Sequence, residues 1–209
     1  MKTRALFVAL LLAAVASAPA LAQTTQFDLG IGYQWDDVTG NEDVYRTQVK
    51  GKEGFLLDTL SVTMTDPKGD FFDRLTVDAA GIGASPDTRF RAQVGRAGTY
   101  NLRFAYTRAE LYSALPAYAN PFIASGVIPG QHTFDRRRDV IDLDLELLPG
   151  AMVSPIVGYT NQRYWGPGTT TFAFGQDEFA LANDLEEKIS EFRLGVAFGV
   201  AQLRLGRQV

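Results

Sequence analysis

The stretch GTYNLRFAYTR, residues 98–108, alternates between apolar and polar side chains with a period of two. Successive Cβ atoms of a pleated strand point to opposite faces, so this pattern predicts an extended strand with one apolar and one polar face. The side chains expected to share the apolar face are Tyr100, Leu102, Phe104 and Tyr106. Whether that face contacts water, a protein core or lipid decides what the protein does.

The same alternation recurs along the chain, whereas helical periodicity is nearly absent. Clear segments are 27–35, 56–65, 89–94, 141–147, 153–160 and 191–198, and weaker ones are 44–50, 71–83 and 203–207. We therefore predict an all-β fold, an antiparallel up-and-down meander of about ten strands that forms part or all of a transmembrane β-barrel.

The predicted connections between strands come in two sizes. Tight turns are expected at 66–69, 96–98 and 149–150, where glycine and proline favour sharp bends. Long loops are expected at 109–138 and 165–188, at the other end of the sheet. Outer-membrane barrels have this asymmetry. Segment 36–43 is the exception, since by this strand count it falls at the tight-turn end, which indicates an error of one strand there.

The amino terminus has the pattern of an export signal. A basic start, MKTR, precedes an apolar run that ends at Ala20-Leu21-Ala22, so residues 1–22 are predicted to be a bacterial signal peptide and residues 23–209 the barrel domain. The absence of cysteine excludes disulfides, thiolate metal sites and covalently attached c-type haem. The formal net charge of −4 argues against a nucleic-acid partner.

A soluble β-sandwich or lipocalin-like barrel would show the same periodicity with its apolar side inward. We favour lipid outside and water inside because ionisable residues occupy mid-strand positions and aromatic residues cluster near predicted strand ends. The predicted lipid-facing residues are Tyr100, Leu102, Phe104 and Tyr106. The predicted lumen-lining residues are Arg74, Asp78, Arg89, Arg91, Arg103, Asp142, Asp144, Glu146, Glu191 and Arg193. Backbone groups in hydrocarbon must all be paired, so such a sheet has to close.

The last residues, LRLGRQV, lie inside an expected strand and include no terminal aromatic residue. We therefore expect the barrel to be incomplete at Val209.

Several segments resemble large outer-membrane barrels of the MtrB/PioB type. They are NEDVYRTQV (41–49), the alternating stretch 69–108, YANPF (118–122), QHTFDRRRDVIDLDLELLPG (131–150) and DEFAL (177–181). The resemblance implies the amino-terminal portion of a sheath that surrounds a periplasmic multihaem cytochrome, in electron transfer across the bacterial outer membrane. The chain departs from the family in being far shorter and in lacking an amino-terminal cysteine pair.

Three carboxylates, Asp142, Asp144 and Glu146, are expected on one strand face. They could bind a cation or repel anions, but pairing with Arg103 and other arginines is the favoured interpretation, because like charges at that spacing attract basic neighbours. Arg89 and Arg91 could likewise favour anions, or they could be among the arginines that pair with carboxylates on this face.

No catalytic or cofactor motif is present. The single histidine, His132, lies among glycines and prolines without a nucleophile motif, so we expect neither enzymatic activity nor a cofactor. The expected function is a porin-like conduit or sheath in outer-membrane lipid. The alternatives are a small structural or adhesive outer-membrane barrel with ligand-binding loops, and a secreted soluble β-sandwich.

Overall fold

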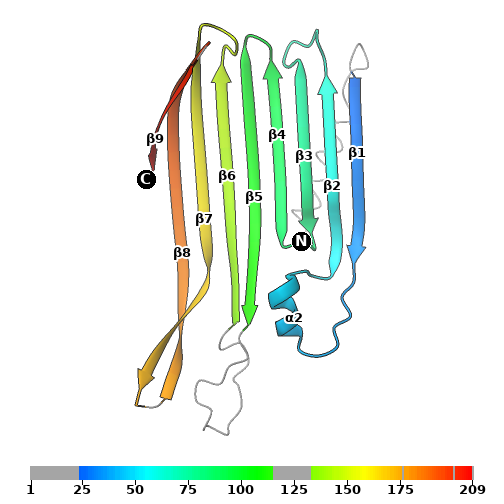
Figure 1. The fold of residues 1–209 in the computed structure, drawn as a ribbon. Coiled ribbons are helices and arrows are strands. Elements are labelled where there is room, and N and C mark those ends of the chain that lie inside the picture. Colours follow the sequence, from blue (N-terminus) through cyan, green and yellow to red (C-terminus); the bar gives the residue numbers. More distant parts are fainter. Residues whose placement is uncertain (1–23, 115–132, 176, 200, 209) are drawn as a thin grey trace.

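The computed structural model describes residues 24–114, 133–175, 177–199 and 201–208. They form a nine-stranded sheet in which each strand pairs with its neighbours in sequence, in the order β1 to β9. Every pairing is antiparallel, so the predicted up-and-down meander is confirmed (Figure 1). The strands are β1 Thr24–Gln34, β2 Gly54–Thr65, β3 Arg74–Gly83, β4 Asp87–Arg96, β5 Tyr100–Ala114, β6 Thr133–Leu147, β7 Val153–Phe174, β8 Asp177–Phe198 and β9 Ala201–Gln208.

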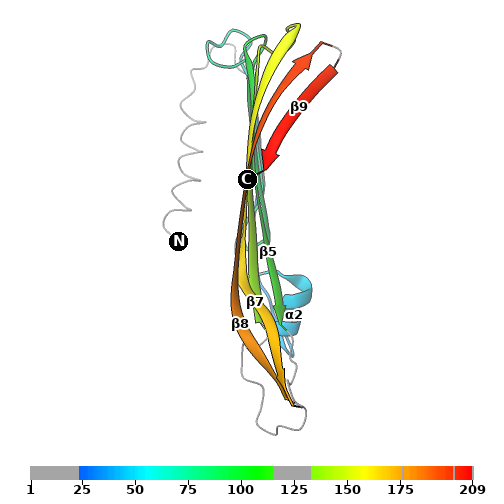
Figure 2. The same cartoon turned by 90° about the vertical axis from the view of Figure 1, so that its left-hand side faces the viewer.

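The described strands form a single layer (Figure 2). Strand β9 turns out of the plane of the others, toward the side on which the one helix of the described residues lies (Figure 2). Strands β1 and β9 are not paired with each other, so the sheet is open within the described residues. These strands alone therefore do not form a closed barrel.

Residues 44–50 were predicted as a weak strand, and this was wrong, because residues 44–49 belong to helix α2, Glu42–Val49, and Lys50 caps it. The Asn41 side chain accepts a hydrogen bond from the Val44 N–H at 3.1 Å, and Lys50 ends the helix in the left-handed conformation. The acidic residues Glu42 and Asp43 fill the first turn, where the helix dipole favours negative charge.

The helix also removes the conflict in the strand count. Without a strand at 44–50, β1 runs from the tight-turn end toward the opposite end, where the 35–53 connection and α2 lie (Figure 1). The tight connections at 97–99 and 148–152 lie at the starting end of β1, together with the 66–73 loop. The predicted sidedness holds only in part, because the tight connection 84–86 lies at the far end (Figure 1). Of the long loop predicted at 109–138, residues 109–114 belong to β5 and residues 133–138 to β6, and the rest lies outside the described residues.

The second long loop, 165–188, was also wrong. Strands β7 and β8 each extend for 22 residues and pair continuously from Val153↔Phe198 to Phe174↔Asp177. Pairing with β6 stops at Trp165, so the outer part is a two-stranded hairpin. Gly166 marks the departure: its φ is +135°, and a Cβ there would lie 2.6 Å from the Asp135 carbonyl oxygen. Pro167 is tolerated because no third strand needs its missing N–H.

Candidate functional site

The strand register aligns the apolar residues into continuous rows across the sheet. One row comprises Phe27, Val62, Val77, Ala92, Phe104, Leu143, Tyr159 and Phe192. The next row toward the tight-turn end comprises Thr25, Met64, Leu75, Val94, Leu102, Leu145, Val157 and Leu194. We call this surface the apolar band. It runs from β1 to β8 and includes Leu102 and Phe104 of the residues predicted to face lipid. The other two, Tyr100 and Tyr106, lie on the same face in the rows on either side.

Much of the apolar band is exposed. Leu194 and Phe192 have 66% and 62% of their surface accessible, and Phe27 has 49%. Tyr100, Leu102, Phe104 and Tyr106 are half-buried, and no second layer of described residues packs on them (Figure 2). Burial is strongest at β2, where Val62 is 2% and Met64 5% exposed. An apolar surface of this extent marks a site of interaction.

All the residues predicted to line a lumen lie together on the opposite face, which we call the polar face. Asp78 stands opposite Arg91, and Arg103 stands opposite Asp144. One row across this face reads Asp28, Ser61, Asp78, Arg91, Ala105, Asp142, Thr160 and Glu191. Arg74, Arg89, Glu146 and Arg193 occupy other rows of the same face.

Two carboxylates of β6, Asp142 and Asp144, form ion pairs with Arg193 of β8. Its Nη2 lies 2.8 Å from Asp142 Oδ1 and 3.1 Å from Asp144 Oδ1. Thr160 of the intervening strand donates to Asp142 Oδ2 at 3.0 Å and accepts a hydrogen bond from Arg193. The favoured interpretation, a mixed-charge pairing, therefore describes these two carboxylates, but their partner is Arg193 rather than Arg103.

Gly158 on β7 allows Arg193 to cross a whole strand. A Cβ at this position would lie 2.5 Å from Asp144 Oδ1 and 2.8 Å from Arg193 Nε, so the arginine passes directly over the missing side chain. This contact was not predicted, because the alternation alone shows Gly158 only as a small polar-face residue. A glycine facing charged residues on both neighbouring strands is the signal that could have found it.

On strands β3 to β5, the arginines of the polar face are not paired with carboxylates in this way. Within the described residues, Arg74, Arg89, Arg91 and Arg103 have no carboxylate oxygen within 4.0 Å. Asp78 instead accepts a hydrogen bond from the Ser61 hydroxyl at 2.8 Å. Arg91 and Arg103 border a shallow depression of about 420 Å³, which Asp142 and Asp144 border from the other side.

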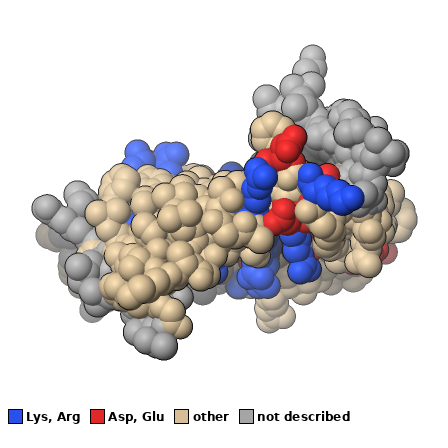
Figure 3. All heavy atoms as spheres, turned by 90° about the horizontal axis from the view of Figure 1, so that it is seen from above, with Lys and Arg blue, Asp and Glu red and all other residues tan. Residues whose placement is uncertain are grey.

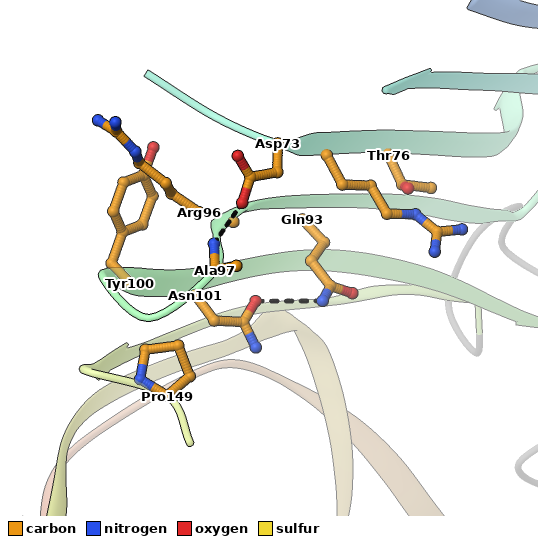
Figure 4. A pocket seen from close by; sticks show the side chains of 10 residues that line it. Asp73, Thr76, Gln93, Arg96, Ala97, Tyr100, Asn101 and Pro149 are labelled. Atoms are coloured by element: carbon orange, nitrogen blue, oxygen red, sulfur yellow. Dashed lines mark hydrogen bonds between the residues drawn. The ribbon is translucent and has the colours of Figure 1, made fainter. Parts of the chain in front are cut away.

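A second hollow, of about 580 Å³, lies at the tight-turn end (Figure 4). Asp73 accepts a hydrogen bond from the Ala97 N–H at 2.5 Å, and Gln93 donates to Asn101 at 3.1 Å. The first contact ties the β2–β3 loop to the β4–β5 turn, and the second joins β4 to β5. Seen from this end, acidic and basic residues gather close together on one part of the surface (Figure 3). Because the polar groups of this hollow are bonded to one another, they indicate a structural role.

The apolar band ends at a group of charged residues on its own face, which we call the outer charge cluster. Its members are Arg108, Arg137, Asp139, Arg163, Glu186 and Lys188, with Trp165 among them. Asp139 receives Arg108 at 2.9 Å and Arg137 at 3.2 Å, and Glu186 receives Arg163 at 2.8 Å and Lys188 at 3.1 Å. Hydrogen bonds from Lys188 and Arg163 lower the pKa of Glu186 below its ordinary value.

The sequence analysis missed this cluster. Its signal was the continuation of the two-residue alternation beyond Ile141 to Asp139 and Arg137, where apolar side chains give way to charged ones on one face.

The remaining predictions and comparisons add no other site. His132 lies outside the described residues. Within the described part of the chain, no group of three or more His, Cys, Asp or Glu residues could hold a metal ion. No helix in that part is long and apolar enough to span a membrane. Comparisons with protein-family models, curated proteins and solved structures give no match.

Proposed function

We propose that this chain forms part of a bacterial outer-membrane β-barrel, with lipid against the apolar band and water against the polar face. The barrel acts as a porin-like conduit or sheath. The observation that carries the proposal is the apolar band itself, which is in register across β1 to β8 and is backed at every row by polar or small side chains.

Strand length supports the proposal. A tilted strand needs about 10 residues to cross the hydrocarbon. Strands β5 and β6 have 15 residues each, and β7 and β8 have 22, so each can cross and project beyond the bilayer. The outer charge cluster follows the band where a strand would leave the hydrocarbon.

A soluble β-sandwich requires a second layer over the apolar face, and the described residues supply none (Figure 2). A structural or adhesive barrel fits the same sheet, and the projecting β7–β8 hairpin is the feature that would serve external binding. The cytochrome partner is supported by the resemblance to MtrB/PioB-type sheaths alone.

The test places one charge on each face of β5. Leu102→Arg puts a cation in the apolar band, whereas the control Thr107→Arg puts it on the polar face. In lipid vesicles we expect Leu102→Arg to lower the free energy of unfolding by about 2–4 kcal/mol, and the control to change it little. Equal effects of the two variants, or an unmodified chain that stays monomeric in buffer without detergent, would contradict the proposal.

The sheath role has its own test. Vesicles that contain a reduced multihaem cytochrome and this chain should reduce an external electron acceptor faster than vesicles that contain the cytochrome alone. Equal rates would remove the sheath role and leave the conduit.

A further inference from the structure

We propose that the outer charge cluster binds the phosphate of an anionic lipid headgroup. The inference rests on the proposed function, since it assumes that acyl chains contact the apolar band. It assigns a ligand chemistry to a surface that the sequence analysis did not recognise.

The outer charge cluster lies directly beyond the apolar part of the same face. Arg108 follows Tyr106 at the next same-face position of β5, and Asp139 precedes Ile141 on β6. On β7 and β8, Arg163 and Lys188 stand opposite each other, one same-face position beyond Asn161 and Ser190. A lipid whose chains lie on the band would therefore carry its headgroup to these side chains.

The outer charge cluster contains more cations than carboxylates. Each carboxylate of the cluster already lies between two cations, Asp139 between Arg108 and Arg137, and Glu186 between Arg163 and Lys188. Cations therefore exceed carboxylates, and the surplus is positive where lipid phosphates lie. Arg163 and Lys188 have 46% and 63% of their side-chain surface accessible, so their remaining N–H groups can reach a ligand.

Two arginines of the cluster lie against one tryptophan ring. The Trp165 ring lies 4.9 Å from the Arg137 guanidinium and 4.7 Å from that of Arg163, which holds both arginines over one aromatic surface. Indole and guanidinium together suit the membrane boundary, where a ring contacts chains and a planar donor fork grips phosphate. The alternative to headgroup binding is that these side chains form only a surface ion-pair network and bind no ligand.

The experiment uses the full chain in nanodiscs of zwitterionic lipid doped with a fluorescent anionic phospholipid. Arg163→Gln with Lys188→Gln removes two cations from the cluster. Its matched control, Arg89→Gln with Arg91→Gln, removes two cations from the polar face. A cation near a membrane surface is worth about 1 kcal/mol, so we expect the first variant to bind the anionic lipid roughly thirtyfold more weakly, and the control to bind it unchanged.

The outcomes separate the two proposals. If every variant inserts but binds the anionic lipid equally, the headgroup site is overturned and the membrane assignment stands. If the unmodified chain inserts into no bilayer, both are overturned. Displacement of the lipid by an equal concentration of inorganic phosphate would overturn the assignment to a lipid. Should the double variant fail to insert, Lys188→Gln alone replaces it, with an expected loss of about fivefold, and an unchanged affinity would overturn the site.

Discussion

Strands β6 to β8 and strands β3 to β5 present the same kind of polar face but organise charge in opposite ways. In β6 to β8, one arginine reaches across a strand and forms ion pairs with two carboxylates. In β3 to β5, Arg91 and Arg103 lie in the rows of Asp142 and Asp144, and Arg89 lies in the next row of the same face. Among the described residues, these three arginines have no carboxylate oxygen within 4.0 Å. The difference teaches that the identity of the residue between two charges matters as much as the charges: a glycine at 158 permits a pairing that a side chain would block.

Among variants of the polar face, the largest expected effect comes from removing Arg193. Arg193→Ala leaves Asp142 and Asp144 side by side without their cation, so we expect the free energy of unfolding to fall by about 2 kcal/mol. Arg103→Ala is the matched control on the other half of the face, and it should change stability by less than about 0.5 kcal/mol. Urea unfolding in detergent micelles measures both. Similar losses from the two variants would erase the contrast between the halves.

Gly158→Val should have a smaller effect, a loss of about 1 kcal/mol, because the new side chain displaces Arg193 while valine favours the strand. The displacement predicts non-additivity. In the Arg193→Ala background the same substitution should have little effect, since the obstructed side chain is gone. A double-mutant cycle of unfolding free energies makes the measurement. Additive losses would show that Gly158 matters for another reason.

The smallest effect concerns the exposed counterpart of the Arg193 pairing, in the outer charge cluster. The lowered pKa of Glu186 means that its ionised form contributes stability above its unfolded pKa, and that this contribution is lost as pH falls through the folded pKa. Lys188→Gln should raise the Glu186 pKa toward its ordinary value. A carboxyl ¹³C NMR titration reports the change, with Lys68→Gln at the tight-turn end as control. An unmoved titration in Lys188→Gln would show that the hydrogen bond from Lys188 is not its main cause.

The sequence predicted most strands and the division of residues between two faces, because the period of two is a local property that burial reinforces. It failed at α2, where residues 44–50 were assigned to a strand. The capping signals were present at Asn41 and Lys50, but a helix of 8 residues, about two turns, carries too little periodicity to be distinguished from the two-residue alternation of the neighbouring segments. It failed again at 165–188, which was predicted as a long loop and is instead a continuous hairpin, in which Gly166 and Pro167 follow the last residue that pairs with β6.

The candidate site was predictable in its members and not in its contacts. Alternation places Asp142, Asp144 and Arg193 on one face, but pairing them requires the register of three strands. The register also reveals the outer charge cluster, which brings Arg108 and Lys188 into one surface from segments far apart in the chain. Periodicity within a segment carries no such information.

The outer part of the β7–β8 hairpin has a consequence for motion. Beyond Gly166, β7 no longer pairs with β6, and the facing part of β8 pairs with β7 alone because β9 pairs with β8 only from Glu191 to Phe198. Isolated two-stranded ribbons are only marginally stable in water. Its amides will therefore exchange with solvent through local openings that leave the remaining sheet intact. The free energy of local opening therefore changes abruptly along the continuous strands β7 and β8. Their outer part can bend or detach while the inner part stays paired within the sheet.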